Sequence, residues 1–171
     1  MTPPSAAPFD IRFAQPADVG VIVAMIRELA EFERLAHLCV ATEAELSTAL
    51  FGPQTAAEVL ISWKADEPTA FALFFHNFST FLGRRGLWLE DLFVRPQHRR
   101  QGHAKALLKR LAEIAMERGC GRFEWAVLDW NARAIDFYRA QGAVVLPDWR
   151  IVRVVGPALT TLAGAANAPA A

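Results

Sequence analysis

A buried strand that leads through a basic glycine turn into a helix is the feature that most constrains this chain. Residues 89–94 (LEDLFV) form an apolar run typical of a strand, although two carboxylates stand in its middle. Residues 99–104 (RRQGHA) follow as a turn, and an amphipathic helix is expected over about 102–118. The first N–H groups of a helix have no intrahelical partner and the dipole is positive there, so this turn can bind a phosphate group. Carboxylates beside an anion site predict two ligands that meet at one strand.

The pattern around this unit predicts a mixed sheet with helices. The expected elements are a strand over 9–13, a helix over about 16–35, a short helix from the capping box at 42–45 to Gly52, strands over 58–63, 69–78 and 87–94, a strand over 122–128, a helix over 132–140 capped by Asn131, and strands over 143–146 and 149–155. A polar turn is expected over 83–86. The strand after the crossover helix should run parallel to 87–94, whereas the three strands before it should be antiparallel. The fold class is therefore α+β (mixed α/β), with a mostly antiparallel sheet flanked by helices on both faces.

Composition favours one globular domain over residues 1–162, with a disordered tail over 163–171. A net charge of zero argues against a nucleic-acid partner. No apolar run approaches the roughly 18 residues of a membrane span, and the first residues do not form a signal peptide. Two cysteines, Cys39 and Cys120, give neither metal spacing nor a disulfide framework. We therefore expect a cytoplasmic protein with no bound metal and no membrane partner.

The basic turn has an ordinary alternative. Six Lys or Arg residues and no Asp or Glu lie between Arg95 and Arg110, which concentrates positive charge at one helix start. The alternative is a plain helix start with a solvated basic face. The turn is not a Walker loop, because no Gly-Lys-Ser/Thr follows. It is not a dinucleotide fingerprint either, because it lacks the G-x-G-x-x-G spacing.

The carboxylates Glu90 and Asp91 are expected on opposite faces of their strand. A buried carboxylate needs a partner, solvent or a function, and either of these two can instead pair with Arg12 or Arg122.

On the helix over 132–140, Asn131 can be a simple cap and Tyr138 a core aromatic. Tyr138 is also the only tyrosine of the chain, so any phenol proton donor must be this residue.

Taken together, LEDLFV, RRQGHA, Trp130-Asn131 and Phe137-Tyr138 before Gly142-Ala143 resemble the GNAT-superfamily N-acetyltransferases. The likeness covers most of residues 10–155 and is closest to their diamine branch, the spermidine/spermine and thialysine enzymes. It implies a GNAT-like sheet with an acyl-CoA wedge between strands 87–94 and 122–128. It also implies acetyl transfer from acetyl-CoA directly to the primary amine of a small cationic substrate: a polyamine, a diamine or a lysine- or thialysine-like amino acid.

The resemblance also implies the site residues. Tyr138 would be the general acid and Glu90 the base, directly or through water, while Asp91 would be structural. The coenzyme would be held by Leu92, Phe93, Val94, Arg99, Arg100, Gln101, Gly102, His103, Ala104, Lys105, Asn131, Ala132, Arg133, Ala134 and Tyr138. The amine would be bound by Phe32, Glu33, Glu90, Glu124, Trp125 and Asp148.

The identity of the amine stays open, since Phe32 stands where the family usually has tyrosine and the segment 144–148 is short. An acetyltransferase for an antibiotic or protein amine is one alternative, and a non-catalytic acyl-CoA-binding module is another. Relatives in this branch are commonly homodimers, so a homodimer is also expected.

Overall fold

The computed structural model describes residues 9–164, and contacts divide the chain into two compact units with the boundary between Ala126 and Val127. The elements in chain order are β1 (Asp10–Phe13), η1 (Pro16–Asp18), α1 (Val19–Phe32), η2 (Ala36–Leu38), α2 (Glu43–Phe51), β2 (Glu58–Lys64), β3 (Glu67–Ser79), β4 (Arg84–Val94), η3 (Pro96–His98), α3 (His103–Glu117), β5 (Phe123–Trp125), α4 (Ala132–Ala140) and α5 (Gly156–Leu162). The first unit holds the sheet with α1, α2 and α3, and the second holds α4 and α5.

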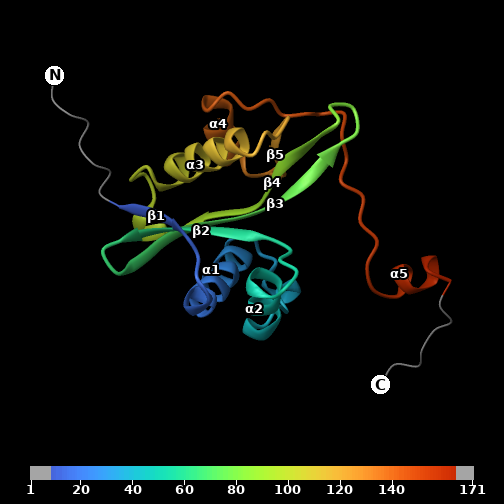
Figure 1. Ribbon diagram of the computed structural model, residues 1–171, viewed down its shortest axis with the longest axis horizontal. Helices are drawn as coiled ribbons and strands as arrows, with labels where there is room; N and C mark the ends of the chain where they lie inside the picture. Colours follow the sequence, from blue (N-terminus) through green and yellow to red (C-terminus); the bar gives the residue numbers. More distant parts are fainter. Residues whose placement is uncertain (1–8, 165–171) are drawn as a thin grey trace. The chain divides into compact units, whose positions relative to one another are not determined.

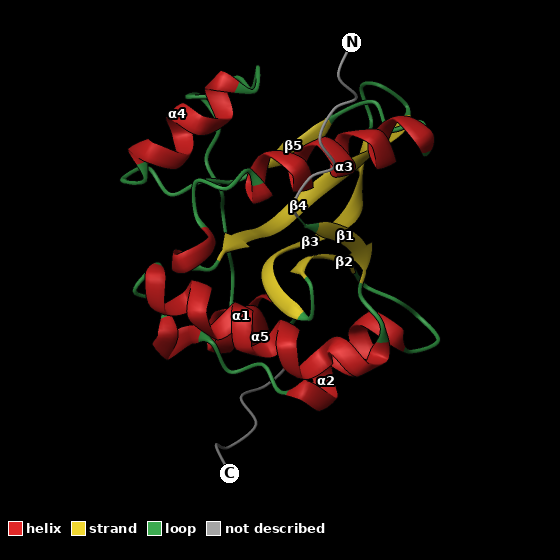
Figure 2. Cartoon of the chain, turned by 90° about the vertical axis from the view of Figure 1, so that its left-hand side faces the viewer, coloured by secondary structure: helices red, strands yellow, loops and turns green. Residues whose placement is uncertain are grey.

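The sheet has the order β1-β2-β3-β4-β5. Its first four strands pair antiparallel, and β5 pairs parallel with β4 after the α3 crossover. In the first unit α1 and α2 cover one face of the sheet and α3 covers the other (Figure 1, Figure 2). The predicted mixed, mostly antiparallel sheet with helices on both faces is confirmed.

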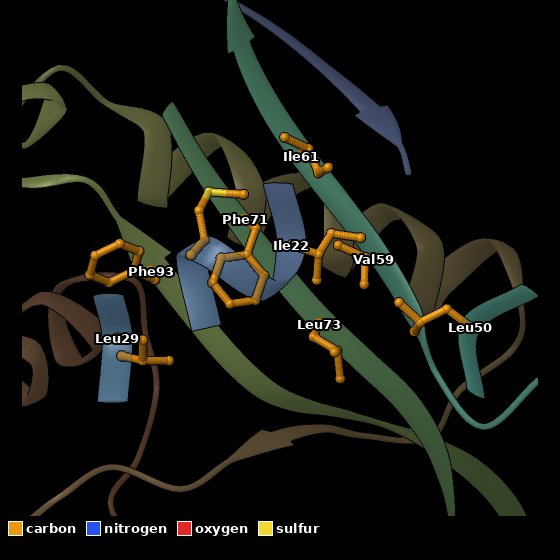
Figure 3. Close-up of a cluster of buried hydrophobic side chains, with 9 residues drawn as sticks. Ile22, Leu29, Leu50, Val59, Ile61, Phe71, Leu73 and Phe93 are labelled. Carbon is orange, nitrogen blue, oxygen red and sulfur yellow. The ribbon is translucent and has the colours of Figure 1, made fainter. Parts of the chain in front are cut away.

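The core on the α1 face follows from helical spacing. Ile22, Met25 and Leu29 recur at three and four residues, which places them on one side of α1, and each is at most 8% exposed. They pack against Phe71 and Phe93 of the sheet (Figure 3). Burial of each of these side chains contributes about 1.5–3 kcal/mol to the stability of the fold. This layer therefore holds α1 against β3 and β4.

The capping box that opens α2 is present as predicted. Thr42 Oγ1 accepts a hydrogen bond from the Glu45 N–H (3.3 Å), and the Glu45 carboxylate accepts one from the Thr42 N–H (2.9 Å). The reciprocal pair satisfies two N–H groups at the helix start.

The predicted turn over 83–86 is wrong in part, because β4 already begins at Arg84. Only Gly83, with φ of +61°, belongs to the turn. Gly86 pairs with Asn77 inside the ladder, and a Cβ there would lie 2.2 Å from Asn77 Oδ1. Gly86 therefore lets the Asn77 side chain lie close to the β4 backbone, and it does not reverse the chain.

The end of the chain differs most from expectation. β5 spans only Phe123–Trp125, and residues 143–155 form neither predicted strand; a helix, α5, follows instead. Valine-rich runs fit a pleated, half-buried surface, and these residues are mostly exposed and pair with no described strand. Residues 165–171 of the expected tail lie outside the described residues, and the single-domain prediction stays a prediction. Over residues 9–164, no helix has both the length and the apolar character needed to cross a membrane.

Candidate active site

Glu90 is the extra residue of a β-bulge in β4. Asp91 lies opposite Leu73 and Leu89 lies opposite Phe74, so Glu90 has no partner residue on β3. A bulge bends its strand and increases the local twist. The chain direction of β4 therefore changes at Glu90, in the middle of the predicted site.

The bulge falls where β4 and β5 part. Their parallel pairing ends at Leu89 and Trp125, and within residues 9–164 no strand pairs with that edge of β4 further on. Residues 92–94 thus offer backbone N–H and C=O groups at an open edge, to which an extended ligand can add as a further strand. The side chain of Phe93, 4% exposed in the core, holds this backbone in place.

The turn after β4 has the backbone conformation of an anion site. Arg100 and Gly102 have φ values of +63° and +92°, and Gly102 is the N-cap of α3. No side chain caps this helix start, so the first N–H groups of α3 are left for a ligand. Open space lies where a Cβ of Gly102 would stand, so its positive φ is what requires glycine.

The positive charge at this turn is smaller than the sequence suggests. Four of the six basic side chains bond to nearby carboxylates or carbonyls; they are Arg95, Arg99, Lys109 and Arg110. Arg100 and Lys105 are exposed and form no ion pair with any residue in the described range. These two flank Gly102, where a phosphate group would lie, so the coenzyme role of the turn and the alternative of a plain solvated basic face both stay predictions.

The end of α1 contacts this turn. Arg99 donates from Nε to the Val94 carbonyl (3.1 Å), and its guanidinium carbon lies 4.8 Å from the ring centroid of Phe32. A cation over an aromatic face is attracted by the ring quadrupole. The structure therefore brings a predicted substrate residue beside the predicted coenzyme turn.

Glu90 and Asp91 do not point to opposite faces, contrary to the prediction. Trp88 Nε1 donates to Glu90 Oε2 (2.9 Å), so these two side chains share a side of β4. Trp88 lies opposite Phe75 and Asp91 opposite Leu73, and alternate residues of β3 face the same side. The bulge breaks the alternation in β4, and both carboxylates face the α1 side.

Asp91 is a largely buried carboxylate, and no described residue supplies a cation to pair with it. Burial, and then repulsion from Glu90 and Glu33, raises the pKa of Asp91 from 3.8 to about 6. Burial also raises the pKa of Glu33, just past the end of α1. Among residues 9–164 nothing forms a hydrogen bond or ion pair with the Asp91 carboxylate.

The alternative pairing of these carboxylates with Arg12 or Arg122 is also wrong. Arg12 binds Asp18 at 2.8 Å and Arg122 binds Glu124 at 2.7 Å. Both arginines are therefore engaged elsewhere.

The remaining predicted substrate residues of the first unit lie on β5. Glu124 forms an ion pair with Arg122 (2.7 Å) and accepts a hydrogen bond from Asn77 Nδ2 (3.3 Å). The ring of Trp125 lies 4.9 Å from that of Phe123. Glu124 is thus already partly neutralised by Arg122.

The second unit carries the other predicted residues. Asn131 is the N-cap of α4, since its Oδ1 accepts a hydrogen bond from the Ala134 N–H (3.2 Å). Ala132 and Arg133 form the first turn of α4, and Tyr138 lies further along it, its ring 5.3 Å from that of Phe137. Asp148 is exposed in a turn. The cap is confirmed, and the roles of these residues toward a ligand stay predictions.

Comparison with known proteins decides the family. The acetyltransferase (GNAT) family matches residues 23–143. The chain belongs to the GNAT family. A thialysine N-epsilon-acetyltransferase of Mus musculus is 38% identical over 90% of this chain and 96% of its own length. An L-ornithine N5-acetyltransferase of Arabidopsis thaliana is 34% identical over 95% and 98%.

Solved structures agree on the GNAT fold. An integron cassette protein from the mobile metagenome of V. cholerae superposes with a TM-score of 0.78 at 24% identity, over 92% of this chain and 99% of that chain. This GNAT chain is an N-acetyltransferase, a member of a family that uses acetyl-CoA as co-substrate and whose named relatives act on small amines.

The open β4 edge and the uncapped turn of this GNAT enzyme fit such a co-substrate. An extended arm can pair along residues 92–94, and a pyrophosphate can lie at the start of α3. Sequence reasoning missed the character of Asp91, which it assigned to structure alone. The available signal was a second carboxylate in an apolar run. Its environment was not predicted because side chains were assumed to alternate between the two faces along the whole strand, which the bulge prevents.

Proposed function

We propose that this enzyme transfers the acetyl group of acetyl-CoA directly to the primary amine of a small cationic substrate, such as a diamine, a polyamine or a lysine-like amino acid. One observation carries the proposal: the bulge at Glu90 lies between an acidic face and an open strand edge that leads to an anion-binding turn. The relatives named for thialysine and ornithine acetylation support an amino acid with a terminal amine.

Acetyl-CoA supplies an acetyl group activated as a thioester. The backbone of Leu92–Val94 would align its extended arm, and the N–H groups of residues 100–105 would hold its pyrophosphate. The exposed side chains of Arg100 and Lys105 would add charge there. Residues 131–134 are proposed to contact the coenzyme as well.

The chain must remove a proton from the amine, because a free alkylamine has a pKa of about 10.4 and attacks only when neutral. Glu90 is exposed at the bulge and would accept this proton directly or through water. Asp91, whose pKa is raised to about 6, lies next to it on the same face and would receive the proton in turn.

Tyr138 would return a proton to the departing sulfur. A phenol with a pKa of about 10 can protonate a thiolate with a pKa of about 8.5 when the two are in contact. Its Oη is the only phenol oxygen in the chain.

The substrate would be recognised as a flexible cation. Glu33 and Glu90 would offer carboxylates and Phe32 an aromatic wall on the α1 side of the sheet. Glu124 and Trp125 on β5, and also Asp148, are proposed as further substrate-binding residues. Because Arg122 already pairs with Glu124, Glu33 should contribute more than Glu124 to binding of the cationic substrate.

A thiol-release assay tests the proposal. Wild-type enzyme is given acetyl-CoA with lysine, thialysine, ornithine or spermidine, each separately, and product is identified by mass. Turnover with at least one amine and none with a neutral analogue of equal length is expected. Binding of acetyl-CoA without turnover on any cationic amine would contradict the proposal and favour a non-catalytic acyl-CoA-binding role.

We also propose a homodimer in the cytoplasm, with its interface on the late apolar segment. Side chains more than 40% exposed there are Val144, Val145, Leu146, Trp149, Ile151, Val152, Val154, Val155, Leu159 and Leu162. So much exposed apolar surface in one segment is typical of an interface. Light scattering of the wild type should give twice the chain mass, and Val152→Glu should lower it; a monomeric wild type would contradict the dimer.

A further inference from the structure

His103 is the first residue of α3, next to the turn glycine, yet its side chain is only 1% exposed. The ring packs against Phe9 with centroids 4.0 Å apart. Its Nδ1 lies 2.9 Å from Ser62 Oγ on β2 and 3.1 Å from Thr69 Oγ1 on β3. The start of the coenzyme helix is thus attached to two strands of the sheet through one imidazole.

One hydrogen bond fixes the role of the Thr69 hydroxyl. Thr69 Oγ1 donates its hydrogen to the Ser62 carbonyl (3.0 Å), so toward His103 it can only accept. The tautomer with the proton on Nδ1 is the one in which His103 can donate to Thr69 Oγ1, and it leaves Nε2, which is buried and has no hydrogen-bond partner among the described residues, without a proton. Burial, with the nearby positive groups of His98 and Lys64, lowers the pKa of His103 and keeps the ring neutral at neutral pH.

Thr69 is itself the extra residue of a second bulge. Ser62 lies opposite Ala70 and Trp63 opposite Pro68, so Thr69 has no partner on β2. Its carbonyl accepts a hydrogen bond from the Arg95 N–H (3.0 Å).

Three residues of the segment between β4 and α3, Arg95, His98 and His103, are attached to β3. At the start of the segment, the Arg95 N–H donates to the Thr69 carbonyl. At its end, His103 Nδ1 contacts the hydroxyl of the same threonine. Between them His98 Nε2 bonds to Glu67 Oε1 (2.9 Å). Residues 100–102 lie between the last two of these attachments, and no side chain caps the helix that follows.

We propose that His103 is a positioning residue for coenzyme binding. Its imidazole holds the first turn of α3, and with it Gly102, on the β2–β3 hairpin, so that the amide N–H groups of residues 102–105 stay aimed at the pyrophosphate. The inference rests on the proposed acetyl-CoA site. Pre-organised donors bind an anion without the entropic cost of ordering the turn, so loss of the anchor should weaken coenzyme binding and leave the chemical step intact.

Two substitutions separate hydrogen bonding from volume. His103→Leu keeps bulk and removes the donor, whereas His103→Asn places an amide near the position of Nδ1 and loses bulk. The double variant Ser62→Ala/Thr69→Val removes the acceptors from the other side. Each protein is measured for the Kd of CoA by calorimetry, for kcat and the KM of acetyl-CoA, and for stability in urea.

His103→Leu is expected to raise both the Kd of CoA and the KM of acetyl-CoA about tenfold, the effect of one lost anchoring hydrogen bond, with kcat within about twofold of wild type. His103→Asn should stay within about threefold of wild type in Kd. The Ser62/Thr69 double variant should match His103→Leu, and combining them should add nothing further, as for residues of one network.

The proposal is overturned if His103→Leu or the Ser62/Thr69 variant binds CoA as wild type does, or if Asn is no better than Leu. If His103→Leu does not fold, the Kd of CoA is compared between His103→Asn and the Ser62/Thr69 variant. An equal Kd for these two proteins then overturns the proposal. A wild type that binds no CoA refutes the proposed function itself. Failure of the proposed function can therefore be told apart from failure of the His103 proposal, in which the wild type does bind CoA.

Discussion

Replacing Asp91 by asparagine should stabilise the protein at neutral pH, although it removes a residue of the candidate site. The pKa of Asp91 rises from 3.8 to about 6 because the carboxylate is buried and faces Glu90 and Glu33. At about 1.36 kcal/mol per pH unit, this rise corresponds to about 3 kcal/mol. Asparagine has nearly the same shape and no charge, so it avoids this cost.

The sign follows from proton linkage. The folded protein holds the Asp91 proton more tightly than the unfolded chain, so the stability that this group contributes is fully present below about pH 4. It is lost as the pH rises through about 6. The free energy of unfolding of Asp91→Asn minus that of wild type should therefore increase by about 3 kcal/mol between pH 4 and pH 8.

Urea unfolding at half-unit pH steps measures this difference directly. Asp66→Asn, an exposed aspartate in the turn between β2 and β3, is the matched control and should give a difference that stays within about 0.5 kcal/mol at every pH. A pH-independent difference for Asp91→Asn would refute the reasoning, because it would mean that the Asp91 carboxylate titrates alike in both states.

Three further changes test the mechanism and the turn. Tyr138→Phe should lower kcat about 100-fold with the Kd of CoA unchanged, and an unchanged kcat would remove Tyr138 from proton transfer. Glu90→Gln should flatten the acid limb of the kcat/KM–pH profile, whereas a profile identical to wild type would exclude it as base. Gly102→Ala should cost about 1 kcal/mol of stability and weaken CoA binding, since φ of +92° strains any side chain; calorimetry and urea unfolding that both match wild type would contradict that reading.

Local patterns in the sequence predicted the elements that carry clear periodicity. The spacing of Ile22, Met25 and Leu29 specified the buried face of α1, and Thr42 with Glu45 specified the start of α2. The glycine turn before α3 was also located, since strand, turn and helix patterns followed one another without a gap. These features depend on residues a few positions apart, which sequence shows directly.

Features that depend on a partner strand were not predictable in the same way. The run over 149–155 has the composition of a strand, but a ladder needs a neighbour, and composition does not supply one. Gly86 looked like a turn residue because the side chain that demands its small size, Asn77, lies nine positions earlier and on another strand. Likewise, nothing near His103 in sequence indicates Ser62 and Thr69 as its partners.

The bulge at Glu90 shows how one residue can determine both halves of the candidate site. An unbroken β4 would alternate Glu90 and Asp91 to opposite faces and could continue its pairing with β5 past Leu89. One extra residue changes both outcomes: it brings the two carboxylates to the α1 side, and it bends β4 where the edge of residues 92–94 opens. A β4 without the bulge would therefore send Glu90 and Asp91 to opposite faces and lose the acidic face, even though every other element kept its place.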